Sequence, residues 1–293
     1  MNNIKLVYWN QINLGDLLSP YIISKLSGLP IIHKNFYMLG VRGQINLLLS
    51  FLLSRIPKNE FLETLFFFER NLLAVGSILA WGNKRSIIWG SGFMNQNESF
   101  RGGQVCAVRG KLTNERLISM GFKGCNVFGD PALLLPLFIS PVATKIHDIA
   151  IIPHWREFDY FQGEYGNRYK ILDIRTANIE SFVAELTSCR HVLSTSLHGI
   201  ILSHAYGIPA LWIKKSYIDT DGFKFYDYFS SVEIPFYSGI IDFDSYLSKN
   251  DWRVLFGQYE KYILPYKNIY SIQKELLSVA PFRVLNQYRR LFK

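Results

Sequence analysis

The stretch that most constrains the fold is residues 190–212, RHVLSTSLHGIILSHAYGIPALW. It has the pattern of a short apolar strand around His191–Leu193, a polar turn, a small-residue helix over Gly199–Tyr206 and a second strand. That succession is typical of one unit of a parallel sheet, in which a helix connects two strands. The chain is therefore predicted to be an α/β protein.

The polar turn of this unit follows the carboxyl end of its first strand. Ligands of open α/β sheets bind in the crevice at that edge, where the N-terminus of the next helix offers backbone N–H groups to an anion. His198 is the main candidate there, because imidazole titrates near neutral pH and can donate or accept a proton. The alternative is that His198 caps the helix or fills a polar niche in the core.

The first predicted strand-to-helix junction carries further candidates. Ile4–Trp9 is expected to be a strand and Leu17–Leu26 a helix, which places Asn13, Gly15 and Asp16 in the loop between them. Such a loop can direct backbone groups and a carboxylate at a ligand. Asp16 is alternatively a helix N-cap.

Later junctions add Ser91, Arg109 and Asp130. Ser91 lies between two glycines in WGSG, where the backbone can approach a ligand closely. Arg109 ends the strand-like VCAVR before a predicted helix, and its guanidinium can form paired hydrogen bonds with a phosphate or carboxylate, although an isolated arginine is usually a surface ion pair. Asp130 ends another short strand and is either a turn residue or an acceptor for a substrate hydroxyl.

Two segments carry large apolar side chains in unusual density. Residues 45–70 contain INLLLSFLLSR and FLETLFFFER, which are expected to be buried helices, with a membrane-docking surface as the alternative. The basic tail from Pro281 places Phe282, Leu285, Tyr288 and Phe292 on one predicted helical face. That helix either lies on an anionic leaflet or packs across two domains.

Length and charge narrow the class of protein. At 293 residues the chain suits one large domain or two of ordinary size. Two domains are expected, at 1–140 and 145–264, with 265–293 as a basic amphipathic helical tail. The net charge of +9 comes without an arginine-rich tract or zinc-finger spacing, so anionic small substrates or an anionic membrane surface are expected as partners, and nucleic acid is not.

Cysteine usage and the N-terminal residues indicate the compartment. The three cysteines are widely spaced and form no CxxC pair, so neither a disulfide framework nor a thiolate zinc site is expected. No signal peptide is recognised. No cluster has the spacing of metal ligands, so no metal is expected. The expected location is the cytoplasm, with peripheral association at the inner face of the plasma membrane.

Seven motifs in order carry a family resemblance: NxGD, WGSG, VRGKLT, GDPALLLP, IIPHW, STSLHGIILSHAYGIPA and FKFYDYF. With them, the chain resembles the polysaccharide pyruvyltransferase family from Val7 to about Ser230, and within it the xanthan-type ketal pyruvate transferases. The resemblance lapses over roughly residues 31–70 and after about 240. It implies a GT-B-like fold, with two Rossmann-like domains and the active cleft between them.

The family resemblance also implies a reaction. Members transfer the enolpyruvyl group of phosphoenolpyruvate to a hexose of a surface polysaccharide or polyprenyl-linked repeat unit, forming a pyruvate ketal and releasing phosphate. Phosphoenolpyruvate is then a co-substrate, and no cofactor is implied. Two alternatives remain: a GT-B glycosyltransferase that uses a nucleotide sugar, and a non-catalytic glycan-binding or assembly protein.

By resemblance, His198 in the LHG motif is the leading acid/base and Arg109 the leading ligand of phosphoenolpyruvate. Many members have arginine directly before LHG, where this sequence has Ser196, and Lys224 of the FKxxDY element is expected to supply the second positive charge. His154 is either a second acid/base or a core histidine. Donor binding is also assigned to Ser196, Leu197 and Gly199. Binding of the acceptor, or ordering of the loops, is assigned to Asn13, Gly15, Asp16, Ser91 and Asp130.

Overall fold

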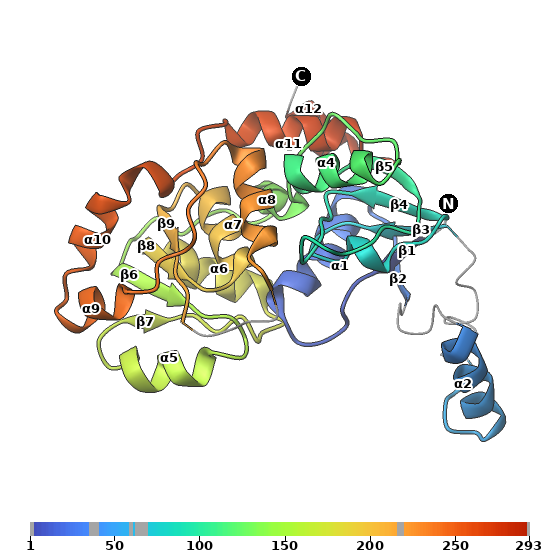
Figure 1. Cartoon of the computed structure of the whole chain (residues 1–293), viewed down its shortest axis with the longest axis horizontal. Coiled ribbons are helices and arrows are strands. Elements are labelled where there is room, and N and C mark those ends of the chain that lie inside the picture. Colours follow the sequence, from blue (N-terminus) through green and yellow to red (C-terminus); the bar gives the residue numbers. More distant parts are fainter. Residues whose placement is uncertain (1–2, 35–40, 59–60, 62–69, 216–219, 292–293) are drawn as a thin grey trace.

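Two parallel β-sheets organise the protein. The computed structural model describes residues 3–34, 41–58, 61, 70–215 and 220–291. All strand pairs are parallel, in the orders β2-β1-β3-β4-β5 and β7-β6-β8-β9 (Figure 1). The strands are β1 (Ile4–Val7), β2 (Ile31–Lys34), β3 (Asn71–Leu73), β4 (Ser86–Trp89), β5 (Gln104–Ala107), β6 (His147–Ile152), β7 (Lys170–Ile171), β8 (Cys189–Ser194) and β9 (Ala210–Trp212). The predicted α/β class is confirmed.

Each sheet has one point at which its strand order reverses. In the first sheet β1 lies between β2 and β3, and in the second β6 lies between β7 and β8. The loops that leave the carboxyl ends of such neighbouring strands diverge and open a crevice, which is where ligands bind in α/β sheets. The loops after β1, β3, β6 and β8 are therefore the ones to inspect for a site.

Helices connect and cover the strands. They are α1 (Leu14–Ser27), α2 (Val41–Leu52), α4 (Lys111–Ser119), α5 (Phe158–Tyr165), α6 (Ile179–Thr187), α7 (Leu197–Ala205), α8 (Phe223–Val232), α9 (Phe243–Ser248), α10 (Trp252–Gln258), α11 (Ile269–Ser278) and α12 (Asn286–Arg290), with 3-10 turns η2 (Leu79–Trp81), η3 (Pro131–Leu137) and η4 (Glu260–Tyr262). The unit predicted around His198 is present as β8, α7 and β9. Its apolar strand is central in its sheet and its helix is buried over nearly its whole length.

The helix after β1 begins earlier than its sequence pattern predicts. Asn13 is its N-cap, and the Asn13 side-chain oxygen accepts a hydrogen bond from the backbone N–H of Gly15 at 3.2 Å. Such a cap satisfies one of the N–H groups that the first turn leaves without a partner. Gly15 and Asp16 consequently lie in the first turn of α1, and the expectation that they belong to the preceding loop is wrong.

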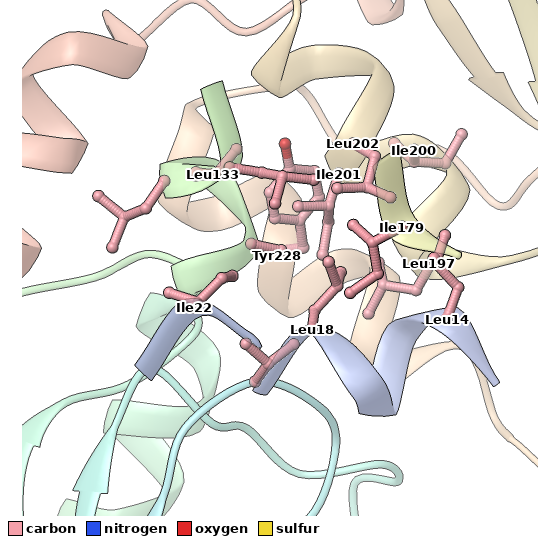
Figure 2. Close-up of a cluster of buried hydrophobic side chains, with 14 of the residues drawn as sticks. Leu14, Leu18, Ile22, Leu133, Ile179, Leu197, Ile200, Ile201, Leu202 and Tyr228 are labelled. Atoms are coloured by element: carbon pink, nitrogen blue, oxygen red, sulfur yellow. The ribbon is translucent and has the colours of Figure 1, made fainter. Parts of the chain in front are cut away.

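One apolar core joins the two sheets. Leu14, Leu18 and Ile22 of α1 point toward Ile201 of α7 and Leu133 of η3 (Figure 2). These side chains are fully buried. Because α1 follows β1 and α7 follows β8, packing these two helices together brings the two strand-order reversals face to face.

The C-terminal segment returns to the first sheet. The indole N–H of Trp89 donates to the carbonyl oxygen of Leu276 at 2.9 Å, and the Gln273 amide donates to the carbonyl of Leu133 at 2.7 Å. Residues 281–285 are not helical, so the predicted helical face that includes Phe282 is wrong; Phe282 instead packs edge-on against Trp89. Phe292 lies outside the described residues.

Helix α2 does not pack into the body of the protein. It projects from the molecule (Figure 1), and the side chains of Ile45, Leu48, Leu49, Leu52 and the following Leu53 are 47% to 66% exposed. The expectation of buried helices is therefore wrong for this segment, and residues 62–69 of the second apolar run lie outside the described residues. In the part of the chain that the structure describes, no helix is both long enough and apolar enough to cross a bilayer.

Candidate functional site

A cavity of about 260 Å³ lies where the loops of the two sheets meet. Four strand-end loops line it: Trp9 and Asn13 follow β1, residues 76–78 follow β3, residues 154–156 follow β6, and residues 196–198 follow β8. Lys224, at the start of α8, completes the polar part of the wall. The cavity thus lies at the strand-order reversals of both sheets, as expected for a ligand site in parallel sheets.

Helix α7 begins at the cavity because Ser196 is its N-cap. Ser196 and Leu197 are buried and line the cavity. Gly199 does not line it. A Cβ atom at Gly199 would lie 2.3 Å from the Ser194 hydroxyl and 2.9 Å from a methyl of Ile152, so this glycine allows α7 to pack closely on the sheet.

His198 is held between Gly15 and Asp130. A Cβ atom at Gly15 would come within 2.2 Å of His198 Nδ1, so only glycine leaves space for the imidazole at this turn of α1. On the other side of the ring, Nε2 is 4.0 Å from Asp130 Oδ2. Neither of these two atoms has a hydrogen-bond partner among the described residues. The pair is therefore one small movement away from sharing a proton.

Burial and two nearby positive charges keep His198 neutral. Burial, together with the positive charges of Lys224 and Arg109, lowers its pKa to about 3. At neutral pH the imidazole is then a proton acceptor. An anion bound in the cavity would oppose those positive charges and raise this pKa.

Asp130 is fully buried beneath the cavity. Its Oδ1 atom caps η3 by accepting a hydrogen bond from the backbone N–H of Ala132 at 2.9 Å. Burial raises the pKa of Asp130 to about 7, against the lowering effects of that backbone bond and of Arg109. The carboxyl group can therefore hold or release a proton near neutral pH.

We expect Asp130→Asn to stabilise the protein at alkaline pH. The raised pKa means that the native state resists ionising Asp130, whereas the unfolded chain ionises it near pH 4, so this group costs stability progressively between about pH 4 and pH 7. Asparagine keeps the cap to Ala132 and removes the charge, so thermal unfolding should show a gain of about 1–3 kcal/mol at pH 8 and a smaller gain at pH 5. An equal difference at both pH values would contradict the buried, titrating carboxyl.

Asp16 and Lys224 form a second polar pair on the cavity wall. Burial raises the pKa of Asp16 to about 7, and Lys224 opposes that shift. Burial and the charge of Arg109 lower the pKa of Lys224 to about 8, and Asp16 opposes that shift. At neutral pH the cavity thus contains a mostly protonated ammonium group beside a carboxyl group that is about half protonated.

Arg109 supports the cavity wall from behind. It is fully buried, and its Nε donates to Asp227 Oδ2 at 2.9 Å, while its terminal nitrogens donate to the Ser77 hydroxyl and the Phe93 carbonyl, both at 2.6 Å. Asp227 also accepts hydrogen bonds from the backbone N–H and hydroxyl of Thr113, both at 2.7 Å. Arg109 does not line the cavity, so the predicted direct contact with a donor is corrected here to a supporting one. Its charge still reaches His198 and Lys224.

Two other predicted residues have supporting or lining positions. Ser91 is buried outside the cavity, where its hydroxyl donates to the carbonyl of Gly76 at 2.8 Å and holds the loop after β3. His154 lines the cavity and is half-buried; its backbone N–H donates to the Thr195 hydroxyl at 2.7 Å, and its ring lies beside Trp155.

Sequence reasoning missed several residues of the site. Trp9 and Trp155 lie in the loops that follow β1 and β6, so the strand-end rule that selected His198 could have found them. Ser77 lies in a loop with no distinctive motif. Asp227 is the aspartate of the FKxxDY element, but its pairing with Arg109, 118 positions away, had no local signal.

Comparison with known proteins shows the family of this chain. Residues 48–217 match the family model described as polysaccharide pyruvyl transferase. An uncharacterized protein of Acanthamoeba polyphaga mimivirus is 34% identical over 166 residues, which are 53% of this chain and 58% of that protein. This chain therefore covers less than two thirds of that relative. Because the matched family region is more than half of the 293 residues and carries much of the cavity wall, the chain belongs to the polysaccharide pyruvyl transferase family.

Proposed function

We propose that this protein transfers the enolpyruvyl group of phosphoenolpyruvate to a hexose of a surface polysaccharide or polyprenyl-linked repeat unit, forming a pyruvate ketal and releasing phosphate. One observation carries the proposal: the cavity combines the Lys224 ammonium group, the neutral His198 imidazole and the Asp16 carboxyl group with a pKa of about 7. A small anionic donor needs a cation, and ketal formation needs an acid and a base that both work near neutral pH.

The proposed reaction requires proton transfers and the formation of two bonds to C2 of the donor. Carbon C3 of the donor accepts a proton, while a sugar hydroxyl gives up its proton and bonds to C2. The bond from C2 to the phosphate oxygen then breaks, and a second hydroxyl bonds to C2 and closes the ketal. The proton of one hydroxyl replaces the one delivered to C3, and the proton of the other leaves with phosphate.

The positions of the side chains suggest the following roles. Lys224 and the backbone N–H groups at the start of α7 hold the anionic groups of the donor. Asp16, which carries a proton part of the time at neutral pH, protonates C3. His198 accepts the hydroxyl proton, and Asp130 behind it orients the imidazole and stabilises it once it is charged.

The two-sheet architecture supports a GT-B-like arrangement for this chemistry. We interpret residues 1–140 and 145–264 as two Rossmann-like domains with the active cleft between them, and 265–293 as a segment that crosses back to the first domain. The hydrogen bonds from Trp89 to Leu276 and from Gln273 to Leu133 support that crossing. In such an arrangement each domain contributes one wall of the cavity.

Ligand-dependent thermal unfolding tests the donor. Phosphoenolpyruvate at 100 times its Kd should stabilise the protein by about 2.7 kcal/mol, and Lys224→Met should abolish that shift because methionine keeps the packing and removes the charge. UDP- and GDP-sugars should give no shift. Stabilisation by a nucleotide sugar alone would favour a glycosyltransferase, and no shift with either ligand would favour a glycan-binding protein.

The exposed face of α2 supports a second role, binding to an anionic membrane surface. Its exposed apolar side chains have the i, i+3, i+4, i+7 spacing of one helix face. Exposed Arg55 and Lys58 follow the helix and complement negatively charged headgroups. We propose that α2 inserts this face into the leaflet that carries a polyprenyl-linked acceptor. The face is formed by Ile45, Leu48, Leu49 and Leu52.

We expect the double variant Leu48→Asp, Leu52→Asp to bind anionic vesicles at least about tenfold more weakly than the wild type, because it places two charges on the apolar face. Cosedimentation with phosphatidylglycerol vesicles measures this, and phosphatidylcholine vesicles measure the contribution of headgroup charge. Ile118→Asp is the control, since Ile118 is 56% exposed on α4, away from α2. Equal binding by both variants would exclude α2 as the contact.

A further inference from the structure

Indole side chains form the outer part of the cavity. Trp9, Trp81 and Trp155 line it and are half-buried, whereas the polar residues Ser196 and Lys224 are buried. The cavity therefore has a polar interior and an aromatic rim. None of the reaction steps proposed above uses these indoles.

Trp9 and Trp155 come from opposite sheets and meet at this rim. Trp9 follows β1 and Trp155 follows β6, and their ring centroids are 5.9 Å apart with an angle of 49° between the rings. The guanidinium carbon of Arg156 lies 4.9 Å from the centre of a Trp155 ring, which adds a hydrogen-bond donor beside the aromatic face. Two large, rigid apolar surfaces and adjacent polar groups are thus placed at one corner of the cavity.

We infer that this corner binds the acceptor saccharide, with a pyranose ring stacked on Trp9 and Trp155. This inference rests on the proposed function, since it identifies the substrate bound beside the donor. A pyranose presents C–H groups on its faces and hydroxyl groups around its edge. Stacking the C–H face on indole buries apolar surface. The hydroxyl groups at the edge can then point inward to His198 and Asp16.

The shape of the corner favours a saccharide over a nucleobase. A planar base that is sandwiched between two rings needs them to be parallel, and the 49° angle between these indoles leaves no parallel slot. A puckered sugar ring fits two inclined surfaces. The cavity of about 260 Å³ also lies below the usual range of about 300–1,000 Å³ for drug-sized ligands, which suits a small donor and one terminal sugar.

Saturation-transfer NMR with irradiation of aromatic protons tests this inference directly. The probes are the methyl pyranosides of galactose, glucose and mannose, titrated without phosphoenolpyruvate. Trp9→Ala and Trp155→Ala should each weaken the binding of the preferred glycoside by at least about tenfold, and Trp9→Phe and Trp155→Phe should remain within about threefold of wild type. The control is Phe236→Ala, which removes a 55% exposed aromatic ring outside the cavity.

The outcomes separate this inference from the proposed function. Loss of glycoside binding in both alanine variants, with rescue by phenylalanine and an unchanged thermal shift with phosphoenolpyruvate, supports it. Unchanged binding in the alanine variants, no glycoside binding by the wild type, or tryptophan-dependent binding of uridine or guanosine in place of glycosides would overturn it. If glycosides bind through both indoles but phosphoenolpyruvate gives no shift, the saccharide site stands and the donor assignment fails.

Discussion

Replacing His198 by alanine is expected to reduce phosphate release from phosphoenolpyruvate by about 10²- to 10⁴-fold, the usual contribution of a positioned acid or base. Stability should change little, because Nε2 of His198 has no hydrogen-bond partner among the described residues and its side chain is 16% exposed at the cavity. Phosphate release with the glycoside that binds best measures the activity, and thermal unfolding of the same samples measures the stability.

Gly15→Ala should reproduce most of that loss without touching a titratable group. The new Cβ atom would require His198 Nδ1, 2.2 Å away, to move, and the imidazole would leave its position beside Asp130. Alanine is intrinsically better than glycine inside a helix by about 1 kcal/mol, so a loss of activity cannot be ascribed to a weaker α1. Gly163→Ala in α5 is the matched control, because nothing lies within 4 Å of its new Cβ atom. Full activity of both Gly15→Ala and His198→Ala would refute the assigned role.

Arg109→Met is expected to destabilise the protein by about 3–5 kcal/mol. Removing one member of a buried ion pair leaves the other charge without compensation. Arg109 and Asp227 are both fully buried and 2.9 Å apart. Without Arg109, Asp227 would remain in the core with Thr113 as the side chain's one hydrogen-bond donor residue among the described residues. Urea unfolding measures the loss. Adding Asp227→Asn to Arg109→Met should recover part of it, which a double-mutant cycle would quantify.

A surface pair provides the control for Arg109. Lys111 and Glu233 are 3.9 Å apart with side chains 48% and 52% exposed, so Lys111→Met should cost less than about 1 kcal/mol. If Arg109→Met were as stable as Lys111→Met but no longer gave a thermal shift with phosphoenolpyruvate, Arg109 would be a direct ligand of the donor. Because Arg109 is buried behind the cavity wall, we expect Arg109→Met to lose much more stability than Lys111→Met.

Local pattern was sufficient for the elements around the site. The apolar run of β8, the polar turn and the small-residue helix α7 depend on residues within a few positions of one another, so the sequence predicted all three and placed His198 at the edge where ligands bind. Asn13 illustrates the limit of the same reasoning. Its side chain caps α1 and draws Gly15 and Asp16 into the helix, a choice that rests on the geometry of one hydrogen bond.

The spatial neighbours of each predicted residue could not be predicted from the local sequence pattern. Asp130 became the neighbour of His198, and Asp227 the partner of Arg109, because α1, α7, η3 and α8 pack into one core between two sheets. Helix α2 shows the same limit of prediction from the sequence. Its apolar pattern predicted burial, and only the tertiary structure shows that no described part of the protein covers its outer face.

The sequence by itself thus determined the α/β class, the helix-strand unit around His198 and several polar residues at strand ends. The tertiary structure decided which strand ends meet. It also decided that the Arg109 charge is buried behind the cavity wall and that the Lys224 charge lines the cavity. The physical reason is that secondary structure follows from short-range sterics and periodicity. The proton affinities of His198, Asp16 and Lys224 depend instead on burial and on charges brought close by packing.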